Sequence, residues 1–152
     1  MVGRLIKRSS LDSVLEAQLR AVVYLFLLDS PVDADYLGAL DTLTINAGSF
    51  RIGPDNLNGP HRLAPAELQT RTGQMSQALK QLALRGLVAY VAKPDVGFRL
   101  TSDGETVANE MRTGYANQLF ASALDVLEHI GDASTTELTS LIISTDRPEG
   151  VA

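Results

Sequence analysis

Residues 84–104, LRGLVAYVAKPDVGFRLTSDG, decide the fold class of this chain because they hold the pattern of a β-hairpin between two helices. Gly86 fits the left-handed position that commonly ends a helix. The two strands are expected in the apolar runs on either side of a turn at residues 93–97: Leu87, Val88, Tyr90 and Val91, and then Phe98, Arg99 and Leu100. Because two strands alone are marginally stable, the hairpin must pack against helices.

Helical segments precede the hairpin. Apolar residues at helical spacing predict a first helix that starts after Ser9 or Ser10 and ends at Asp29–Pro31, where proline cannot continue the hydrogen-bond ladder. The end of this helix is apolar all round, so we expect it in the core. The helix directly before the hairpin is expected over residues 64–85, with a break near Thr72–Gly73 as an alternative.

A further helix and a loop lie between these two segments. The helix is expected to run from Asp33, its N-cap, to about Asn46 and to end at Gly48. Residues 48–60 are rich in glycine, proline and asparagine and predict a loop that is long for a compact domain. Such a loop is either functional or a plain connector, and the sequence leaves both readings open.

The chain after the hairpin predicts a long helix. Ser102 and Glu105 have the spacing of a capping box, and an apolar stripe then continues to Ile130, with Gly131 as the end. A helix of about 25 residues along this stripe would be about 38 Å long and would project beyond a small domain. Its far half needs a partner, which is the first helix, the last helix or a second chain, and the candidate interface residues are Met111, Tyr115, Leu119 and Leu127.

The order of the elements predicts a mostly α (α+β) fold. We expect a winged helix-turn-helix domain with a two-stranded wing and long C-terminal helices. Ser134 and Glu137 repeat the capping-box spacing before a last short helix. Residues 1–9 are expected to form a short basic N-terminal arm, residues 10–131 the winged-helix domain with its long helix, and residues 132–152 a short terminal helix and a frayed tail.

The composition of the chain and its apolar segments indicate the cellular compartment that we expect. The 152 residues contain no cysteine, so disulfides, thiolate metal sites and a cysteine nucleophile are excluded, which fits a reducing compartment. The start of the chain lacks the pattern of a secretory signal, and the apolar run at residues 21–28 is too short to span a membrane. We therefore expect a cytoplasmic protein with no membrane contact.

Charge is unevenly distributed and coincides with the expected wing. The chain carries a net charge of −5, but residues 61–99 carry +4 and the remainder −9. Many winged helices place the third helix in the major groove of double-stranded DNA and the wing against the backbone. Since glutamine pairs with adenine and arginine or lysine with guanine or phosphate, the candidate DNA contacts are Arg62, Arg71, Gln74, Gln77, Lys80, Lys93 and Arg99. These cations are few for a domain that must neutralise several phosphates, so a purely protein-docking role stays open.

Catalytic patterns are absent from the sequence. It contains no phosphate-binding glycine loop, no nucleophile elbow and no zinc-protease helix, and His61 and His129 are far apart. The neighbouring carboxylates Asp33, Asp35 and Asp41 are explained as helix caps and a solvated helix face. We expect no enzyme activity, no cofactor and no metal.

Several stretches resemble the middle component of bacterial ABC-three-component systems. They are YLGALDTLTINAGSF at residues 36–50, GPHRLAPAEL at 59–68 and QALKQLALRGLVAY at 77–90, followed by GFRLTSDGETVANEM at 97–111. The resemblance covers about residues 10–130, and it rests on the order and spacing of motifs that are not catalytic.

This resemblance implies a small accessory subunit that acts beside a large SMC or Rad50-type ATPase and a separate effector in defence against phage or plasmids, in the same broad group as Lamassu-type systems. In such a system the ATPase would hydrolyse nucleotide, and the effector would supply killing or cleavage. The middle component would then bind, bridge or regulate the other two. It could also associate with a second copy of itself. Two alternatives remain: a homodimeric winged-helix transcription regulator, and a structural bridge with no nucleic-acid contact.

Overall fold

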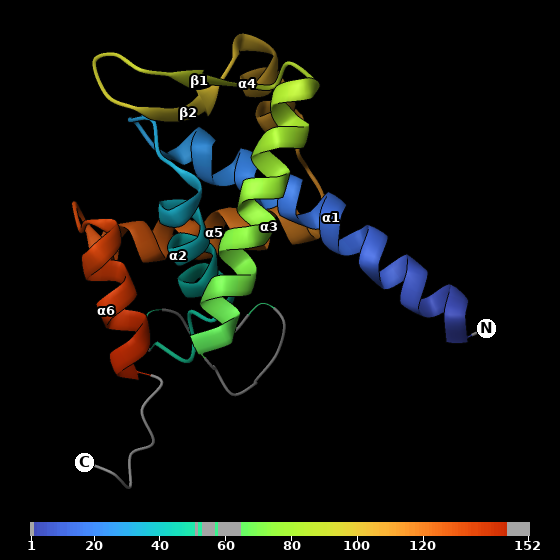
Figure 1. Cartoon of the computed structure of the whole chain (residues 1–152), viewed down its shortest axis with the longest axis horizontal. Helices are drawn as coiled ribbons and strands as arrows, with labels where there is room; N and C mark the ends of the chain where they lie inside the picture. The colour runs from blue at the N-terminus through green and yellow to red at the C-terminus, as the bar shows by residue number, and fades with distance from the viewer. Residues whose placement is uncertain (1, 51, 53–56, 58–64, 146–152) are drawn as a thin grey trace, which may run out of the picture.

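The computed structural model describes residues 2–50, 52, 57 and 65–145 (Figure 1). The chain is mostly helical and has one small antiparallel sheet, which confirms the expected α+β class. The elements in chain order are α1 (Val2–Leu27), α2 (Ala34–Ile45), α3 (Pro65–Leu84), β1 (Val88–Val91), β2 (Gly97–Leu100), α4 (Ser102–Glu110), α5 (Gly114–Ile130) and α6 (Thr135–Thr145). Within these described segments, no helix is long and apolar enough to cross a membrane.

Helix α2 forms the centre of the molecule. Every residue from Leu37 to Ile45 is buried, and α2 packs against α3, α5 and α6 (Figure 1). Asp33 caps the helix as predicted, because its side chain accepts a hydrogen bond from the backbone N–H of Tyr36 at 2.9 Å. The C-terminal half of α1 also lies in the core, as its apolar sequence predicted, whereas its N-terminal half projects from the bundle (Figure 1).

A glycine allows α2 and α3 to approach closely. A Cβ atom added to Gly38 would overlap both the side chain and the backbone of Thr72 on α3. Helix α3 is continuous through this contact, so the break considered near Thr72–Gly73 does not occur.

The hairpin is close to its predicted form. Strands β1 and β2 pair in register from Val88 opposite Leu100 to Val91 opposite Gly97. Gly86 has φ of 76°, which confirms that the chain leaves α3 through a left-handed glycine. Val32, between α1 and α2, adds one rung to the other side of β2, where its N–H and C=O bond to Phe98 at 3.2 and 2.7 Å.

The predicted long helix was wrong. Met111 is extended, with φ −70° and ψ 120°, and the side chain of Thr113 caps a new helix by accepting a hydrogen bond from the N–H of Ala116. Helices α4 and α5 are therefore separate, and each packs against α1 in the same bundle. The apolar stripe continued across the break because both helices bury one face in the same core.

Three predicted helix boundaries also differ. Helix α1 begins at Val2, so the residues expected to form a separate arm are helical from that point on. Helix α2 ends at Ile45, with Asn46 rather than Gly48 at its C-cap. The cap of α4 is Thr101 instead of Ser102, since the Thr101 hydroxyl accepts from the N–H of Gly104 at 3.1 Å.

Two other predicted caps are confirmed. Gly131 ends α5 with φ of 55°. Before α6, Ser134 and Glu137 form the predicted capping box: the N–H of Ser134 donates to the Glu137 carboxylate at 3.1 Å, and the N–H of Glu137 donates to the Ser134 hydroxyl at 3.2 Å. The tail after Asp146 lies outside the described residues.

Substitution of Gly38 by alanine tests the close α2–α3 contact. Gly38→Ala is expected to lower the free energy of unfolding by about 1–3 kcal/mol, because the new methyl group overpacks against Thr72. Gly73→Ala on α3 is the matched control: its Cβ would meet nothing within 4 Å, and higher helix propensity should raise stability by about 0.5–1 kcal/mol. Urea denaturation of both variants measures the difference, and equal effects would contradict the close contact.

Candidate interaction surfaces

A buried ionic cluster joins the first three helices. Asp41 on α2 is fully buried, and its Oδ1 accepts hydrogen bonds from Arg20 Nε at 2.9 Å and from the Tyr24 hydroxyl at 2.5 Å, both on α1. Its Oδ2 lies 3.3 Å from Nη1 of Arg71 on α3. Arg71 Nε also donates to Glu67 at 2.9 Å. We call these five residues the Asp41 cluster.

Burial and charge pairing control the protonation of this cluster. Burial raises the pKa of Tyr24 well above its usual value, and the adjacent Asp41 carboxylate raises it further. Burial alone would lower the pKa of Arg20, but attraction to Asp41 and Tyr24 and the hydrogen bond to Asp41 raise it above its ordinary value. Tyr24 is therefore neutral and Arg20 charged throughout the physiological pH range.

The cluster corrects several sequence-based assignments. Asp41 was expected on a solvated helix face and is instead in the core. Arg71 was a candidate DNA contact, but its guanidinium faces inward and its side chain is only 12% exposed. Gln74 is also held within the chain, because its Oε1 accepts a hydrogen bond from Arg20 at 3.4 Å.

The other candidate DNA contacts are divided between two surfaces. Gln77 and Lys80 are exposed on α3, and Lys93 and Arg99 are exposed on the hairpin. Arg62 lies outside the described residues. The structure thus leaves a smaller basic surface than the sequence predicted.

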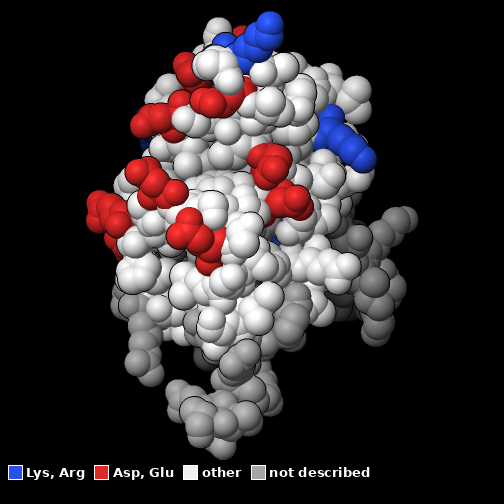
Figure 2. Space-filling model, turned by 60° about the vertical axis from the view of Figure 1, so that its left-hand side comes forward, with Lys and Arg blue, Asp and Glu red and all other residues white. Residues whose placement is uncertain are grey.

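The exposed surface is predominantly acidic. Among the side chains that the structure describes, the exposed basic residues are Lys80, Arg85, Lys93, Arg99 and Arg112. The exposed acidic residues in the same part of the chain are Glu16, Asp29, Asp33, Asp35, Asp95, Asp103, Glu105, Glu110, Asp125, Glu128, Asp132 and Glu137. Figure 2 shows a face on which acidic side chains are numerous and basic ones are few. Such a surface disfavours general attraction to nucleic acid.

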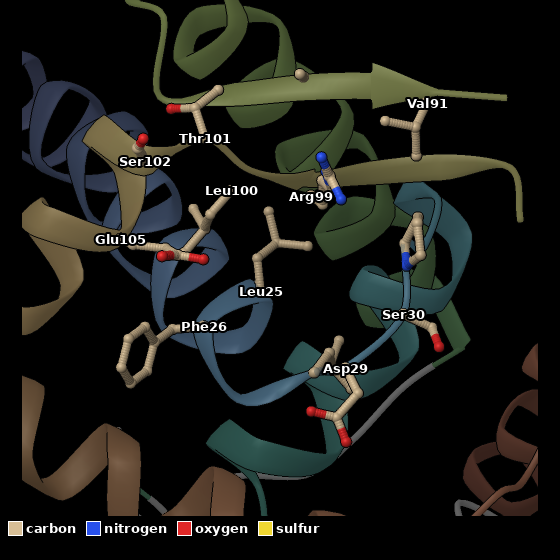
Figure 3. Close-up of a pocket in the computed structure, with 13 residues that line it drawn as sticks. Leu25, Phe26, Asp29, Ser30, Val91, Arg99, Leu100, Thr101, Ser102 and Glu105 are labelled. Carbon is tan, nitrogen blue, oxygen red and sulfur yellow. The ribbon is translucent and has the colours of Figure 1, made fainter. Parts of the chain in front are cut away.

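A groove of about 780 Å³ separates the hairpin from the C-terminal end of α1 (Figure 3). We call it the hairpin groove. Leu25 and Phe26 form part of its apolar lining, and Arg99 lines it together with the carboxylates of Asp29 and Glu105. The two carboxylates weaken the attraction of Arg99 for phosphate inside the groove, so a DNA contact by Arg99 would have to be made outside it.

A second groove, of about 410 Å³, lies between α1 and α3. We call it the α1–α3 groove. Its lining contains no charged side chain and consists of Val14, Ala17, Thr70, Gly73, Gln74, Gln77 and Ala78. Val14 is 42% exposed, and the neighbouring Leu15 is 55% exposed. Both belong to the apolar spacing that predicts the first helix, and that spacing did not indicate an exposed apolar surface.

The predicted partner residues on the C-terminal helices are largely occupied within the chain. Leu119 is fully buried, which makes it a core residue rather than part of a free surface. Met111, Tyr115 and Leu127 are half-buried and pack against the same core. No group of three or more His, Asp or Glu side chains suited to a metal ion occurs among the described residues.

These features define a small helical protein with one β-hairpin and exposed apolar and neutral surfaces suited to contacts with other proteins. A family model described as ABC-three component (ABC-3C) system Middle Component 2 matches residues 10–147. The chain belongs to this family, and it is thus the middle component of an ABC-three-component defence system and has protein partners within it. No curated protein and no solved structure shows significant similarity to the chain.

Neutralisation of Asp41 tests the cluster as a structural requirement. Asp41→Asn is expected to lower the free energy of unfolding by about 3–5 kcal/mol, because it leaves buried Arg20 and Arg71 without their common counter-charge. Asp35→Asn, an exposed carboxylate in the same helix, is the control and should cost less than about 1 kcal/mol. Chemical denaturation measures both, and a small loss for Asp41→Asn would contradict the role of the cluster.

Alkaline pH should destabilise the fold through Tyr24. Tyrosine in the unfolded chain loses its proton near pH ~10, whereas buried Tyr24 keeps it because its pKa is raised. Above about pH 10 the folded state therefore binds more protons, and stability falls as pH rises, by up to about 1.4 kcal/mol per pH unit for one group. Tyr24→Phe should be less stable at neutral pH, by about 1–3 kcal/mol, but show a shallower alkaline decline. An unchanged slope would contradict this assignment.

Proposed function

We propose that this chain is a non-catalytic accessory subunit that bridges or regulates an SMC or Rad50-like ATPase and an effector, in cytoplasmic defence against phage or plasmids within the Lamassu-like group. The observation that carries the proposal is the family match over residues 10–147. The exposed apolar surface beside the α1–α3 groove supports it, because exposed apolar side chains that line a groove are typical of sites for protein contact.

The domain is proposed to be a winged helix-turn-helix. Three helices precede the hairpin, and Val32 pairs with β2, so that the order across the ribbon is Val32, β2, β1. This arrangement supports a wing formed by residues 88–100. Some winged helices bind DNA and others bind proteins, so the fold alone does not indicate which of the two this domain does. The charge and polarity of its surface are needed to distinguish them.

The ATPase is proposed to bind along the exposed side of α1. Val14 lines the α1–α3 groove, and the exposed Leu15 follows it on α1. The N-terminal half of α1 projects from the bundle (Figure 1). A partner that covered this surface would bury apolar area at little desolvation cost, since the groove lining is uncharged. This site takes the place of the α5 surface that the sequence suggested.

Contact with DNA is proposed as a secondary activity of the assembled complex. Lys80, Lys93 and Arg99 are the exposed cations of α3 and the hairpin, and Gln77 lies near Lys80 on α3. Because acidic residues dominate the rest of the described surface, DNA binding by the chain alone should be weak and should fall steeply with salt.

The alternative function is a homodimeric transcription regulator. The exposed Gln77 and Lys80 on the helix before the hairpin favour it, since such a helix can enter the major groove. A regulator would bind one DNA sequence by itself with a dissociation constant of about 10⁻⁸ M or below at physiological salt.

Co-expression with the ATPase encoded beside this chain tests the main proposal. The wild-type protein should co-elute with the ATPase in size-exclusion chromatography. Leu15→Glu should abolish co-elution, because it places a charge in the proposed contact, whereas Leu124→Glu on α5, a leucine with 46% exposure, should not. Failure of the wild-type chain to bind the ATPase, or equal effects of the two variants, would overturn the proposal.

Charge reversal tests the DNA contact. A variant with Lys80→Glu, Lys93→Glu and Arg99→Glu should lose the DNA-dependent part of complex formation, measured by retention of linear double-stranded DNA. Arg112→Glu is the control, because Arg112 is exposed but lies between α4 and α5. DNA retention that is unaltered in the triple variant would exclude a contact through these residues, and sequence-specific binding by the isolated chain would favour the regulator.

A further inference from the structure

The outer edge of β1 carries backbone groups that no described residue pairs. Phe98 on β2 uses both its N–H and its C=O for Val32, on the side of β2 that faces away from β1. Phe98 and Tyr90, which face each other, therefore form a non-hydrogen-bonded pair of the ladder. It follows that the N–H and C=O of Tyr90 point outward from β1. Among the described residues, no other backbone segment bonds to them.

The strand at this edge is only four residues long, but its sequence adds no further protection within the strand. Its sequence from residue 88 to residue 92 is VAYVA, with no charged residue and no proline. Natural proteins protect an edge strand by keeping it short, or with charges, proline, a bulge or a covering segment. Tyr90 is 60% exposed, and its ring packs edge-on against Phe98 with the ring centroids 5.2 Å apart. The edge thus presents an ordered aromatic side chain beside free hydrogen-bonding groups.

We propose that two copies of this chain associate through β1, antiparallel about a two-fold axis, with Tyr90 opposite Tyr90 of the partner subunit. In this register the backbone of Val88, whose side chain is buried in its own chain, pairs with that of Ala92 of the partner subunit, and the two tyrosines exchange both backbone hydrogen bonds. The two hairpins join into one four-stranded sheet. This inference is independent of the proposed function.

The strand is complementary to itself in this register. Ala89 faces Val91 of the partner subunit, so a larger side chain is opposite a smaller one, and the small Ala92 of the partner subunit lies opposite Val88, whose side chain is buried in its own chain. On one face, Phe98, Tyr90 and their symmetry mates form a row of four aromatic rings, and aromatic pairs are among the most favourable cross-strand pairs. A two-fold contact requires this kind of self-complementarity. These matches favour a second copy over an unrelated strand.

Single cysteines test the register directly, because the chain has no cysteine of its own. Opposite residues in a hydrogen-bonded antiparallel pair have Cα atoms about 5.5 Å apart, which suits a disulfide. Tyr90→Cys should therefore form a disulfide-linked dimer under mild oxidation. Val96→Cys, at an equally exposed residue of the turn, should remain monomeric. A dimer from both variants or from neither would overturn the proposal.

A second pair of variants distinguishes the contribution of the Tyr90 backbone to dimer affinity from that of its side chain. Tyr90→Pro removes the outward N–H, and an edge strand tolerates proline where that N–H faces solvent, so circular dichroism should show an intact fold. Its dimer dissociation constant, measured by analytical ultracentrifugation, should exceed that of Tyr90→Ala by about 30-fold, because two intermolecular hydrogen bonds are lost. Equal constants for these variants, or a wild-type chain that is monomeric at all concentrations, would overturn the proposal without affecting the ATPase test.

Discussion

Burial of the Asp41 carboxylate is the constraint on which the helical core depends. Removal of a charge from water costs several kcal/mol per ion, so a fully buried carboxylate has to be paired. Its partners come from α1, through Arg20 and Tyr24, and from α3, through Arg71. These contacts fix three helices relative to one another, and Gly38 permits α3 to lie close enough to α2 for Arg71 to reach the cluster. Hydrophobic contacts could adjust gradually if a helix shifted, but an ion pair with this geometry could not.

The same cluster determines what the surface can do. Two of the arginines are used inside the molecule, and most exposed charged side chains in the described part of the chain are acidic. Two of the surfaces that the described residues offer for binding are apolar or neutral: Val14 and Leu15 beside the α1–α3 groove, and the edge of β1. A subunit with such surfaces is better suited to protein contacts than to neutralisation of many phosphates, which agrees with its place in a family of system components.

Among the described residues, backbone hydrogen bonds from outside the hairpin reach β2 and the ends of the ribbon but not the outer side of β1. Val32 bonds to Phe98, and Thr101 bonds both to Leu87 through its N–H and to Gly86 through its hydroxyl, at 3.0 and 2.7 Å. These bonds anchor β2 and the beginning of α4 and leave the outer side of β1 free. One edge of the ribbon is thus used for folding, while the other remains available for association.

Local sequence signals determined the elements, and tertiary packing determined the surfaces. Gly86, the Asp33 cap and the capping box of Ser134 and Glu137 were all readable, because each satisfies backbone groups within a few residues. The break between α4 and α5 was not predicted. The spacing of apolar residues indicates which side chains are buried, but it does not require the backbone to stay helical between them. Arg20 and Asp41 are 21 positions apart, and no local pattern could show that they neutralise each other. Only the packing of α1, α2 and α3 decided that Asp41 and Arg71 lie inside and that Leu15 lies outside, because burial of a charge depends on partners that the fold brings from distant segments.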